Sequence, residues 1–455
     1  MKQVLLVYLF MLSVKVGTIA QPFKLLRYDE DYSTFKDSTS TAHNRIKYIQ
    51  LSDQANIYFS LGFDMRQELD YAVNEDWGET GLGTDIFWLQ RYNTHVDFHV
   101  GDRLRLFGQL RSGLEDGRKN GPRRIDEDKL NVQNLFLDII PYKNADKSLT
   151  LRLGRQEMQY GSGRLVDVRN GPNLRLYFDG IKTAYHSPRL KVDAFVLADS
   201  KVNFGVFDNV SNRKPNLWGT YSTFGNAHSM NVDLYYLGID RANATYDDGV
   251  GNELRHTVGA RFWRNKKGFS YNFEGAYQFG NFGNRDISAW TCSAEISFSF
   301  DNIQGAPVVK LRHDYISGDK TKGDDRLGTF NPLYPKGGYF GFNPQVGPAN
   351  LIDLHPSILW KLIDNVAVDF NVVLNWRYAH QDGIYGPNGL FVLSSSGSSE
   401  SFIGTAYLTS VSWDINSFLN FNTGLQYFKT GNFIDDVVKQ HKDGFFVGSV
   451  LEFTF

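Results

Sequence analysis

The sequence is poor in cysteine, because its 455 residues contain only one, Cys292. A single thiol forms no internal disulfide and supplies too few ligands for a thiolate metal site. The ten histidines show no HExxH pairing, and the sequence contains no G-x-S-x-G turn. We therefore expect no metal site, no cofactor and no enzyme activity.

Long apolar runs are also missing, with one exception at the N-terminus. Lys2 precedes the run "VLLVYLFMLSV", and the small residues Thr18 and Ala20 follow where a signal peptidase would cut. The run is about a dozen residues long and ends at Lys15, so it is too short for the roughly 20 residues of a membrane helix. We expect residues 1–20 to be a secretory signal peptide. No later run is longer, which excludes a helical membrane protein.

The chain has no marked excess of charge of either sign. Its 48 Lys and Arg residues nearly balance its 50 Asp and Glu residues. Without residues 1–20, which hold two lysines and no acids, the balance becomes 46 − 50 = −4. This balance excludes the strongly basic surface of a nucleic-acid-binding protein.

What the sequence does contain is aromatic residues, 15% of the total, set in alternating patterns. In "FSLGFDMRQELDY" at 59–71 the apolar residues occupy odd positions and the even positions are polar or glycine. The same alternation returns in "SYNFEGAYQFG" and "VDFNVVLNWRY". A period of two indicates β-strands. Ten residues at about 3.3 Å each, tilted by about 45°, span roughly 23 Å, close to the apolar band of an outer-membrane barrel.

The pattern predicts about eighteen strands, an even number. We place them at 57–71, 87–100, 103–115, 131–140, 148–156, 177–187, 189–199, 216–224, 231–240, 253–264, 269–280, 286–300, 306–317, 351–362, 366–379, 401–414, 418–428 and 445–455. The strand at 216–224 has the weakest pattern and is placed partly to keep the number even.

The predicted connections alternate between short and long. Tight turns such as "GD" at 101–102 contrast with long loops at 116–130, 157–176, 200–215, 318–350, 380–400 and 429–444. Short turns on one side and long loops on the other are typical of outer-membrane barrels. The break at 281–285 is an exception, because it is short where a long loop is expected.

Alternation alone fits either a soluble β-protein or a membrane barrel. In a barrel the apolar face meets lipid and the polar face lines water, and 16–18 strands leave room for a channel. The polar faces here carry many arginines, which favours a wet lumen. The alternative is a secreted propeller or solenoid, but no internal repeat of fixed period supports it. We predict an all-β, antiparallel up-and-down transmembrane barrel at 57–455, preceded by a periplasmic segment at 21–56.

The stretch "GRQEMQYGSGRLVDVRNGPNLRLYFDG" at 154–180 resembles the alginate export family of outer-membrane proteins. Further blocks are similar to that family in the same order: "LRYDEDYS" at 26–33, "EGAYQFG" at 274–280, "SGD" at 317–319, "TFNPLYP" at 329–335, "NLIDLHP" at 350–356 and "DGIYGPNG" at 382–389. The resemblance implies an eighteen-stranded barrel that passes an anionic polyuronate outward, with arginines and lysines at a constriction. The strand number from the alternation agrees with it.

An anionic solute needs fixed positive charge along its path, because burying an unpaired carboxylate is costly. Arginine suits carboxylates through its planar fork. The candidates on polar strand faces are Arg66, Arg91, Arg105, Arg111, Arg152, Lys182, Arg255, Arg261, Lys310, Arg312 and Arg377. The loop after the fifth strand adds Arg164, Arg169 and Arg175, and Arg155 at a strand end could point either way.

The alternative interpretation is that these arginines pair with acids and stiffen the barrel wall. The same faces carry Asp64, Glu68, Asp97, Glu115, Asp138, Glu274, Glu295, Asp314 and Asp369. The predicted lumen is therefore mixed in charge, which departs from a simple anion-attracting pore.

Three functions remain open at this stage. The first is a monomeric channel in the Gram-negative outer membrane that passes an anionic oligo- or polysaccharide by passive, charge-guided diffusion. The second is a substrate-selective porin for uptake of small anionic solutes, and the third is a non-conducting receptor or scaffold. The expected partners are membrane lipid and lipopolysaccharide, the barrel-assembly machinery, the saccharide and periplasmic export proteins. A barrel-borne hydrolase would need Ser and His together near the rim, which the sequence does not reveal.

The last strand, "VGSVLEFTF", ends on an aromatic residue. Its alternation predicts that Leu451, Phe453 and Phe455 face lipid. We expect Phe455 to act as the assembly signal, and the last strand to pair with the first, because an open edge in lipid would leave backbone groups unsatisfied.

Overall fold

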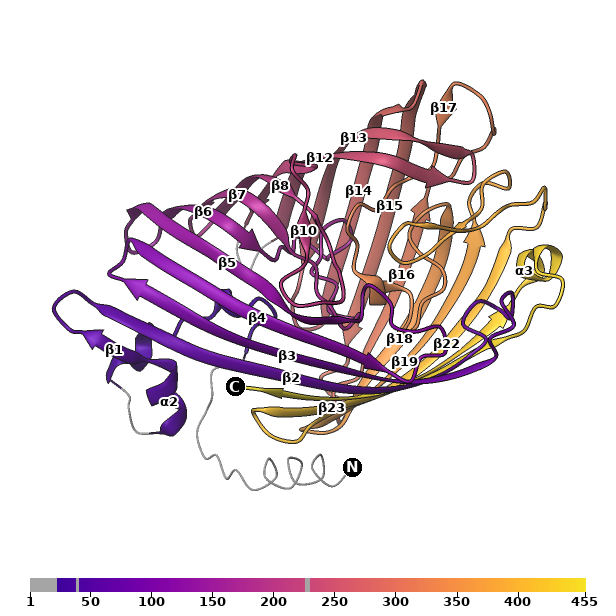
Figure 1. The fold of residues 1–455 in the computed structure, drawn as a ribbon. Coiled ribbons are helices and arrows are strands. Elements are labelled where there is room, and N and C mark those ends of the chain that lie inside the picture. The colour runs from indigo at the N-terminus through magenta and orange to yellow at the C-terminus, as the bar shows by residue number, and fades with distance from the viewer. Residues whose placement is uncertain (1–22, 38–40, 226–229) are drawn as a thin grey trace.

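The computed structural model describes residues 23–37, 41–225 and 230–455, so the predicted signal peptide lies outside the described residues. Within them the main sheet has twenty strands, and eighteen remain when the short β1 (Ile49–Ser52) and β17 (Arg326–Leu327) are set aside. Each of these pairs antiparallel with the next, and β24 pairs with β2. The result is the predicted closed antiparallel barrel (Figure 1).

The barrel strands have the following bounds in chain order: β2 (Ile57–Val73), β3 (Thr84–Val100), β4 (Leu104–Asp116), β5 (Asp128–Lys143), β6 (Ser148–Gln156), β7 (Phe178–His186), β8 (Leu190–Ala198), β11 (Leu217–Phe224), β12 (Asn231–Tyr246), β13 (Gly249–Arg264), β14 (Phe269–Phe282), β15 (Arg285–Ser299), β16 (Val308–Ile316), β18 (Leu351–Ile363), β19 (Val366–Arg377), β22 (Phe402–Asp414), β23 (Leu419–Thr430) and β24 (Gly444–Thr454).

Short elements lie outside the barrel wall: η1 (Arg27–Asp29), η2 (Ser33–Asp37), α2 (Ala42–Lys47), β9 (Ser200–Lys201), β10 (Val210–Ser211), η3 (Gly337–Tyr339), β20 (Ile384–Tyr385), β21 (Phe391–Leu393) and α3 (Asn432–Val437). In the described parts of the chain, no helix has the length and apolar character that a membrane crossing requires. Figure 1 places β1, α2 and the C-terminus toward one end of the barrel, and β17 and α3 toward the other.

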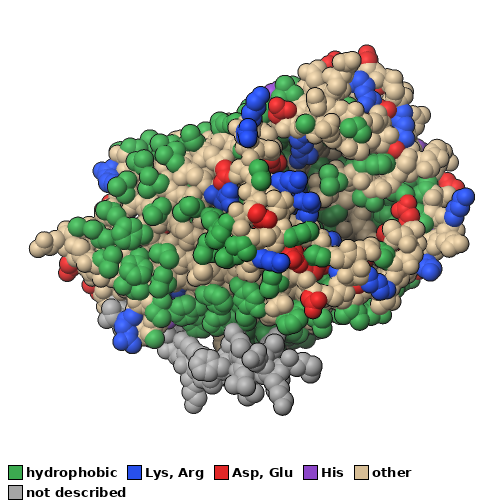
Figure 2. Space-filling model, in the orientation of Figure 1, with side chains coloured by type: hydrophobic (Ala, Val, Ile, Leu, Met, Phe, Trp, Pro, Cys, Tyr) green, Lys and Arg blue, Asp and Glu red, His purple; other side chains and the backbone are tan. Residues whose placement is uncertain are grey.

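The outward face of the strands is apolar. Leu69, Ile86, Leu106, Leu135 and Ile181 are all exposed there, on five different strands. In Figure 2 apolar side chains cover much of the left part of the visible face, and charged side chains gather around a hollow on the right. Exposed apolar surface of this extent suits a lipid environment. Because every wall strand is paired on both sides, no open strand edge faces the lipid.

The strands differ in length around the ring, and this corrects one predicted loop. Strands β6, β7, β8 and β11 have 8 or 9 residues, whereas β12 and β13 have 16 each. The sequence pattern predicts a loop at 241–252, but β12 and β13 continue to a tight turn at 247–248. A bulge between Arg241 and Ala244 hides the continuation, because it shifts the alternation there.

The N-terminal segment, which is described at residues 23–37 and 41–47, occupies one mouth of the barrel. Tyr28 packs edge-on against Phe107 and Phe136, and its hydroxyl donates to the Glu157 carbonyl at 2.5 Å. Phe107 and Phe136 are almost fully buried side chains of β4 and β5. The segment therefore narrows this opening from inside.

The ring of Phe455 does not follow the lipid-facing row that the alternation predicts. Its centroid lies 5.3 Å from the ring of His43 and 5.2 Å from Lys47 Nζ, both in α2. Its backbone still pairs with Phe63 of β2, at 2.7 and 2.9 Å. The terminal residue leaves the strand pattern because α2 offers its ring an aromatic contact at the rim. The role of Phe455 as an assembly signal stays a prediction.

Candidate functional site

The loop 157–177, which follows β6, crosses the barrel interior. Near its start Arg164 Nη1 donates to Asp314 Oδ1 of β16 at 2.8 Å. Farther along, the Asn170 carbonyl accepts from Arg66 Nη1 of β2 at 2.7 Å. Because β6 and β16 lie on opposite sides of the ring of strands, this loop divides the lumen.

A second inward loop, 317–350, meets the first in the lumen. Val166 and Tyr334 form a parallel bridge, and backbone hydrogen bonds of 2.9 Å join Asp167 to Tyr334 and Tyr334 to Leu165. Leu165, Val166 and Tyr334 belong to the largest buried apolar cluster of the molecule. The lumen therefore holds a packed core as well as water-facing charge.

Most of the predicted basic residues face the lumen and lie within 4 Å of a carboxylate. The pairs are Arg66 with Glu68, Arg91 with Glu452, Arg105 with Asp97, Arg111 with Asp128, Arg152 with Asp138, Arg164 with Asp314, Arg175 with Glu157, Lys182 with Asp193, Arg255 with Glu253, Arg261 with Asp233 and Arg312 with Asp314. Such pairing neutralises the wall and holds it rigid.

Two predicted residues sit elsewhere. Arg155 lies on the outward face of β6, where Asp179 holds it at 2.8 and 3.0 Å and Ser211 lies beside it. Arg377 is fully buried and donates to the carbonyls of His380, Asp382, Ser398 and Glu400. Arg155 thus braces the outer wall, and Arg377 holds together the start and end of the loop 378–401.

Arg169 has a different environment from the paired arginines. Its Nε donates to the Pro335 carbonyl at 3.0 Å, and no carboxylate of the described residues lies within 4 Å of its guanidinium. Arg241 of β12 is similar, because its Nη2 donates to the Leu333 carbonyl at 2.8 Å and it also forms no ion pair with a described residue. Arg241 was not among the candidates from the sequence, because position 241 lies between the predicted strands 231–240 and 253–264 and was assigned no face.

Both of these arginines line a cavity of about 960 Å³. Tyr177, Tyr246 and Tyr334 contribute to its wall. The cavity lies beside the short strands β8 and β11 and the bulged part of β12.

The cavity wall carries more positive than negative charge. Arg213 and Lys214 add to Arg169 and Arg241, whereas the acids of the wall are Asp199 and Asp240. Asp199 is already engaged, because its Oδ2 accepts from the Tyr334 hydroxyl at 3.1 Å.

Burial and the neighbouring Arg241 lower the pKa of Arg169 to about 10. The residue therefore stays charged at neutral pH, at a free-energy cost that an anion would relieve.

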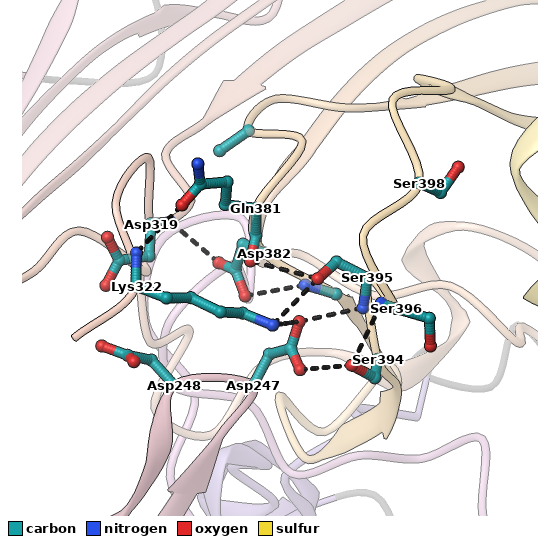
Figure 3. Close-up of polar contacts among 12 residues, drawn as sticks. Asp247, Asp248, Asp319, Lys322, Gln381, Asp382, Ser394, Ser395, Ser396 and Ser398 are labelled. Carbon is teal, nitrogen blue, oxygen red and sulfur yellow. Dashed lines mark hydrogen bonds and ion pairs between the residues drawn. The ribbon is translucent and has the colours of Figure 1, made fainter.

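The extracellular end is covered by a cap, which we define as residues 317–329, residues 378–401 and the turn 247–248. Figure 3 shows Lys322 reaching Asp247 and Ser395, with Nζ 2.8 Å from Asp247 Oδ2 and 2.9 Å from Ser395 Oγ. Among the residues that the structure describes, no group of three or more His, Cys, Asp or Glu side chains is arranged to hold a metal ion.

Asp382 joins two parts of the cap. It accepts from the backbone N–H of Asp319 at 2.9 Å and from the hydroxyls of Thr329 and Tyr385 at 2.6 Å each. Burial raises the pKa of this carboxyl to about 6, although the two hydroxyls oppose the shift.

A family model described as "Alginate export" matches residues 57–447. The chain belongs to the alginate export family. The match covers almost the whole barrel from β2 to within β24, so the chain is an outer-membrane channel barrel, and its family and fold are those of a transporter. A search among curated proteins returns no match.

Solved structures with a similar fold are outer-membrane proteins of Gram-negative bacteria. Acinetobacter baumannii OccAB1 has a TM-score of 0.59 at 10% identity, covering 90% of this chain and 99% of that one. Pseudomonas aeruginosa OpdO has a TM-score of 0.58 at 12% identity, covering 87% and 97%. Pseudomonas aeruginosa OpdK with vanillate has a TM-score of 0.56 at 10% identity, covering 87% and 98%. At these identities the likeness shows the fold alone.

Proposed function

We propose that this protein passes uronate-bearing saccharides across the outer membrane by passive diffusion, and that Arg169 and Arg241 select the solute by its carboxylates. The observation that carries the proposal is the contrast among the arginines. Those along the wall are mostly neutralised by acids, whereas these two line the cavity of about 960 Å³ without a carboxylate partner among the described residues.

The chemistry of the cavity fits a sugar acid. A guanidinium binds a carboxylate through two parallel N–H donors, and charge-assisted hydrogen bonds are about twice as strong as neutral ones. The tyrosines of the wall supply flat apolar faces for the sugar ring. Membership of the alginate export family supports a polyuronate as the solute.

A second candidate is a porin for small anionic solutes. Its support is the packing of the two inward loops, which leaves a cavity of about 960 Å³, a size typical of small-ligand sites. The fold neighbour OpdK was crystallised with vanillate, a small solute, which also favours this candidate. For a polymer to pass, the loops 157–177 and 317–350 must move aside together.

The test is single-channel recording in planar bilayers, with uronate monomers, trimers and long chains added on the extracellular side. In wild type we expect the charged saccharides to block the current and a neutral oligosaccharide to leave it unchanged. Arg169→Gln/Arg241→Gln should weaken the block about tenfold, since a lost charge-assisted hydrogen bond is worth about 1.5–3 kcal/mol. Arg326→Gln, an exposed arginine of β17 outside the cavity wall, is the matched control.

The chain length of the blocker separates the candidates. Block that strengthens from monomer to long chain supports the saccharide channel, and block by monomers alone supports the small-solute porin. Equal block of wild type and the double variant would overturn the assignment of Arg169 and Arg241. A membrane that stays closed under all conditions would favour a receptor or scaffold.

A further inference from the structure

Four aromatic rings form a row inside the barrel, on the side of the short strands. Tyr160 of the loop 157–177 stacks on Phe195 of β8 at 5.6 Å and 12°, and on Tyr221 of β11 at 4.8 Å and 13°. Tyr221 in turn stacks on Tyr235 of β12 at 5.3 Å and 3°. Tyr160 is the one member of the row that a loop supplies, and it lies between two rings of the wall.

The strands β8 and β11 by themselves hold the rings of Phe195 and Tyr221 apart. In the β8–β11 register Phe195 is opposite Gly219 and Tyr221 is opposite Asp193. Phe195 and Tyr221 are therefore diagonal neighbours on the inward face, and Gly219 contributes no side chain between them. The Tyr160 ring fills the space between these two rings. Without it, this space is a slot with two flat apolar walls, wide enough for one six-membered ring.

Polar groups stand at the end of this slot. The Tyr160 hydroxyl donates to Asp193 Oδ2 at 2.9 Å, and Lys182 Nζ lies 3.5 Å from the same oxygen. A carboxylate and an ammonium group side by side provide an acceptor and donors for the hydroxyl groups of a sugar.

Tyr160 is held by a turn rather than by a strand. Gly161 and Gly163 follow it with φ of +58° and +77°, and Gln159 and Gly161 are exposed. The turn is closed by the backbone hydrogen bond from Gly163 to Tyr160, at 3.0 Å. A turn of this kind reorients without breaking the strand ladder.

A second cavity lies near this slot. Arg261, whose Cδ lies near Gly161, lines a polar cavity of about 400 Å³ together with Lys310 and Glu295. A saccharide ring in the slot would therefore lie beside this cavity, close to the Arg261–Asp233 pair.

We propose that the slot between Phe195 and Tyr221 is a binding site for one uronate ring, and that Tyr160 fills it as an internal substitute when no saccharide is present. The Tyr160 ring that now fills the slot has apolar faces and a polar edge. A pyranose ring likewise has apolar C–H faces and hydroxyl groups at its edge. Displacing Tyr160 also moves the turn of the loop 157–177 toward the lumen water. The inference rests on the proposed function, because it assigns a further contact to the same saccharide.

The test is calorimetric titration of the purified barrel with a uronate trimer. Tyr160→Ala removes the internal competitor, so we expect binding about tenfold tighter than in wild type. Tyr160→Phe, which keeps the ring and loses the bond to Asp193, should bind with intermediate affinity. Adding Phe195→Ala to Tyr160→Ala should abolish the gain. Tyr236→Ala, an outward tyrosine beside Tyr235, is the matched control and should bind as wild type does.

The outcomes separate this inference from the proposed function. If Tyr160→Ala binds no more tightly than wild type while Arg169→Gln/Arg241→Gln binds more weakly, the slot is refuted and the proposed function stands. If the gain persists without Phe195, the stacking site is refuted. If no variant binds the trimer, both proposals fail.

Discussion

Arg152 and Arg169 are both buried arginines of one barrel, but they occupy opposite electrostatic environments. Arg152 Nε and Nη2 donate to the two oxygens of Asp138 at 2.8 and 2.9 Å, and its guanidinium lies 3.7 Å from the Phe136 ring centroid. Arg169 donates to one backbone carbonyl and lines the cavity of about 960 Å³. The first arginine is held in the wall by an acid, whereas the second has no carboxylate within 4 Å among the described residues. The two agree in burial and residue type, and what differs between them is the set of partners.

The largest expected effect comes from breaking a paired charge. Arg152→Met leaves the buried Asp138 with only the more distant Arg105, whose Nη1 lies 3.8 Å from it. We expect the variant to lose much of the ~3–5 kcal/mol of folding free energy that breaking a buried ion pair typically costs. We expect the urea midpoint of the reconstituted barrel to fall strongly. Arg169→Met should leave it unchanged or raise it slightly, because it removes an uncompensated charge. An equal fall of the urea midpoint in the two variants would contradict the contrast between Arg152 and Arg169.

Lys47 extends the comparison to the N-terminal segment, because it is buried without an ion-pair partner among the described residues. Burial, and then Arg27, lower the pKa of Lys47 to about 7. Lys47 therefore binds its proton less tightly when the N-terminal segment is docked than when the segment is free. The docked state is stabilised as pH rises from about 7 toward 10.

We expect docking of the described parts of the N-terminal segment, residues 23–37 and 41–47, to strengthen by about 2 kcal/mol between pH 7 and pH 9. The measurable result is a lower open-channel current at pH 9. In Lys47→Met the current should be low at both values, since the charge is absent. A pH response that survives in Lys47→Met would assign it to another group.

Asp382 is the acidic counterpart in the cap and is expected to give the smallest effect. With the pKa raised to about 6, the closed cap binds a proton more tightly than an open one, so closure is favoured as pH falls from 7 to 5. The expected gain is about 1 kcal/mol. We predict a lower current at pH 5, a loss of this response in Asp382→Asn, and an unchanged response in Asp324→Asn. An unaltered response in Asp382→Asn would contradict the assignment.

The alternation of residues was sufficient to predict the barrel, because lipid outside and water inside impose a period of two on every strand. Except in β12 and β13, the strand bounds agree within three residues, even at 217–224, where the pattern is weakest. The fold of the loops could not be predicted, since contacts such as Arg164 to Asp314 join residues 150 positions apart without a local signal.

The site was predicted in part. Arg169 was among the candidates, but the sequence could not separate it from Arg152, because the difference is the presence of Asp138 across the strand pair. Arg241 was missed because the bulge in β12 hides its inward face. Tyr160 gave no signal, since its stacking partners come from strands that follow it in the chain.

The proposal that Arg169 and Arg241 select the solute is tested most directly by the reversal potential in a tenfold KCl gradient. We compare wild type with Arg169→Glu/Arg241→Glu and with the matched control Arg213→Glu/Lys214→Glu, which changes two exposed residues at the same cavity. We expect anion preference in wild type, a shift to cation preference in the first variant and a smaller shift in the second. Unchanged anion preference in Arg169→Glu/Arg241→Glu would contradict the claim that these two arginines select the solute.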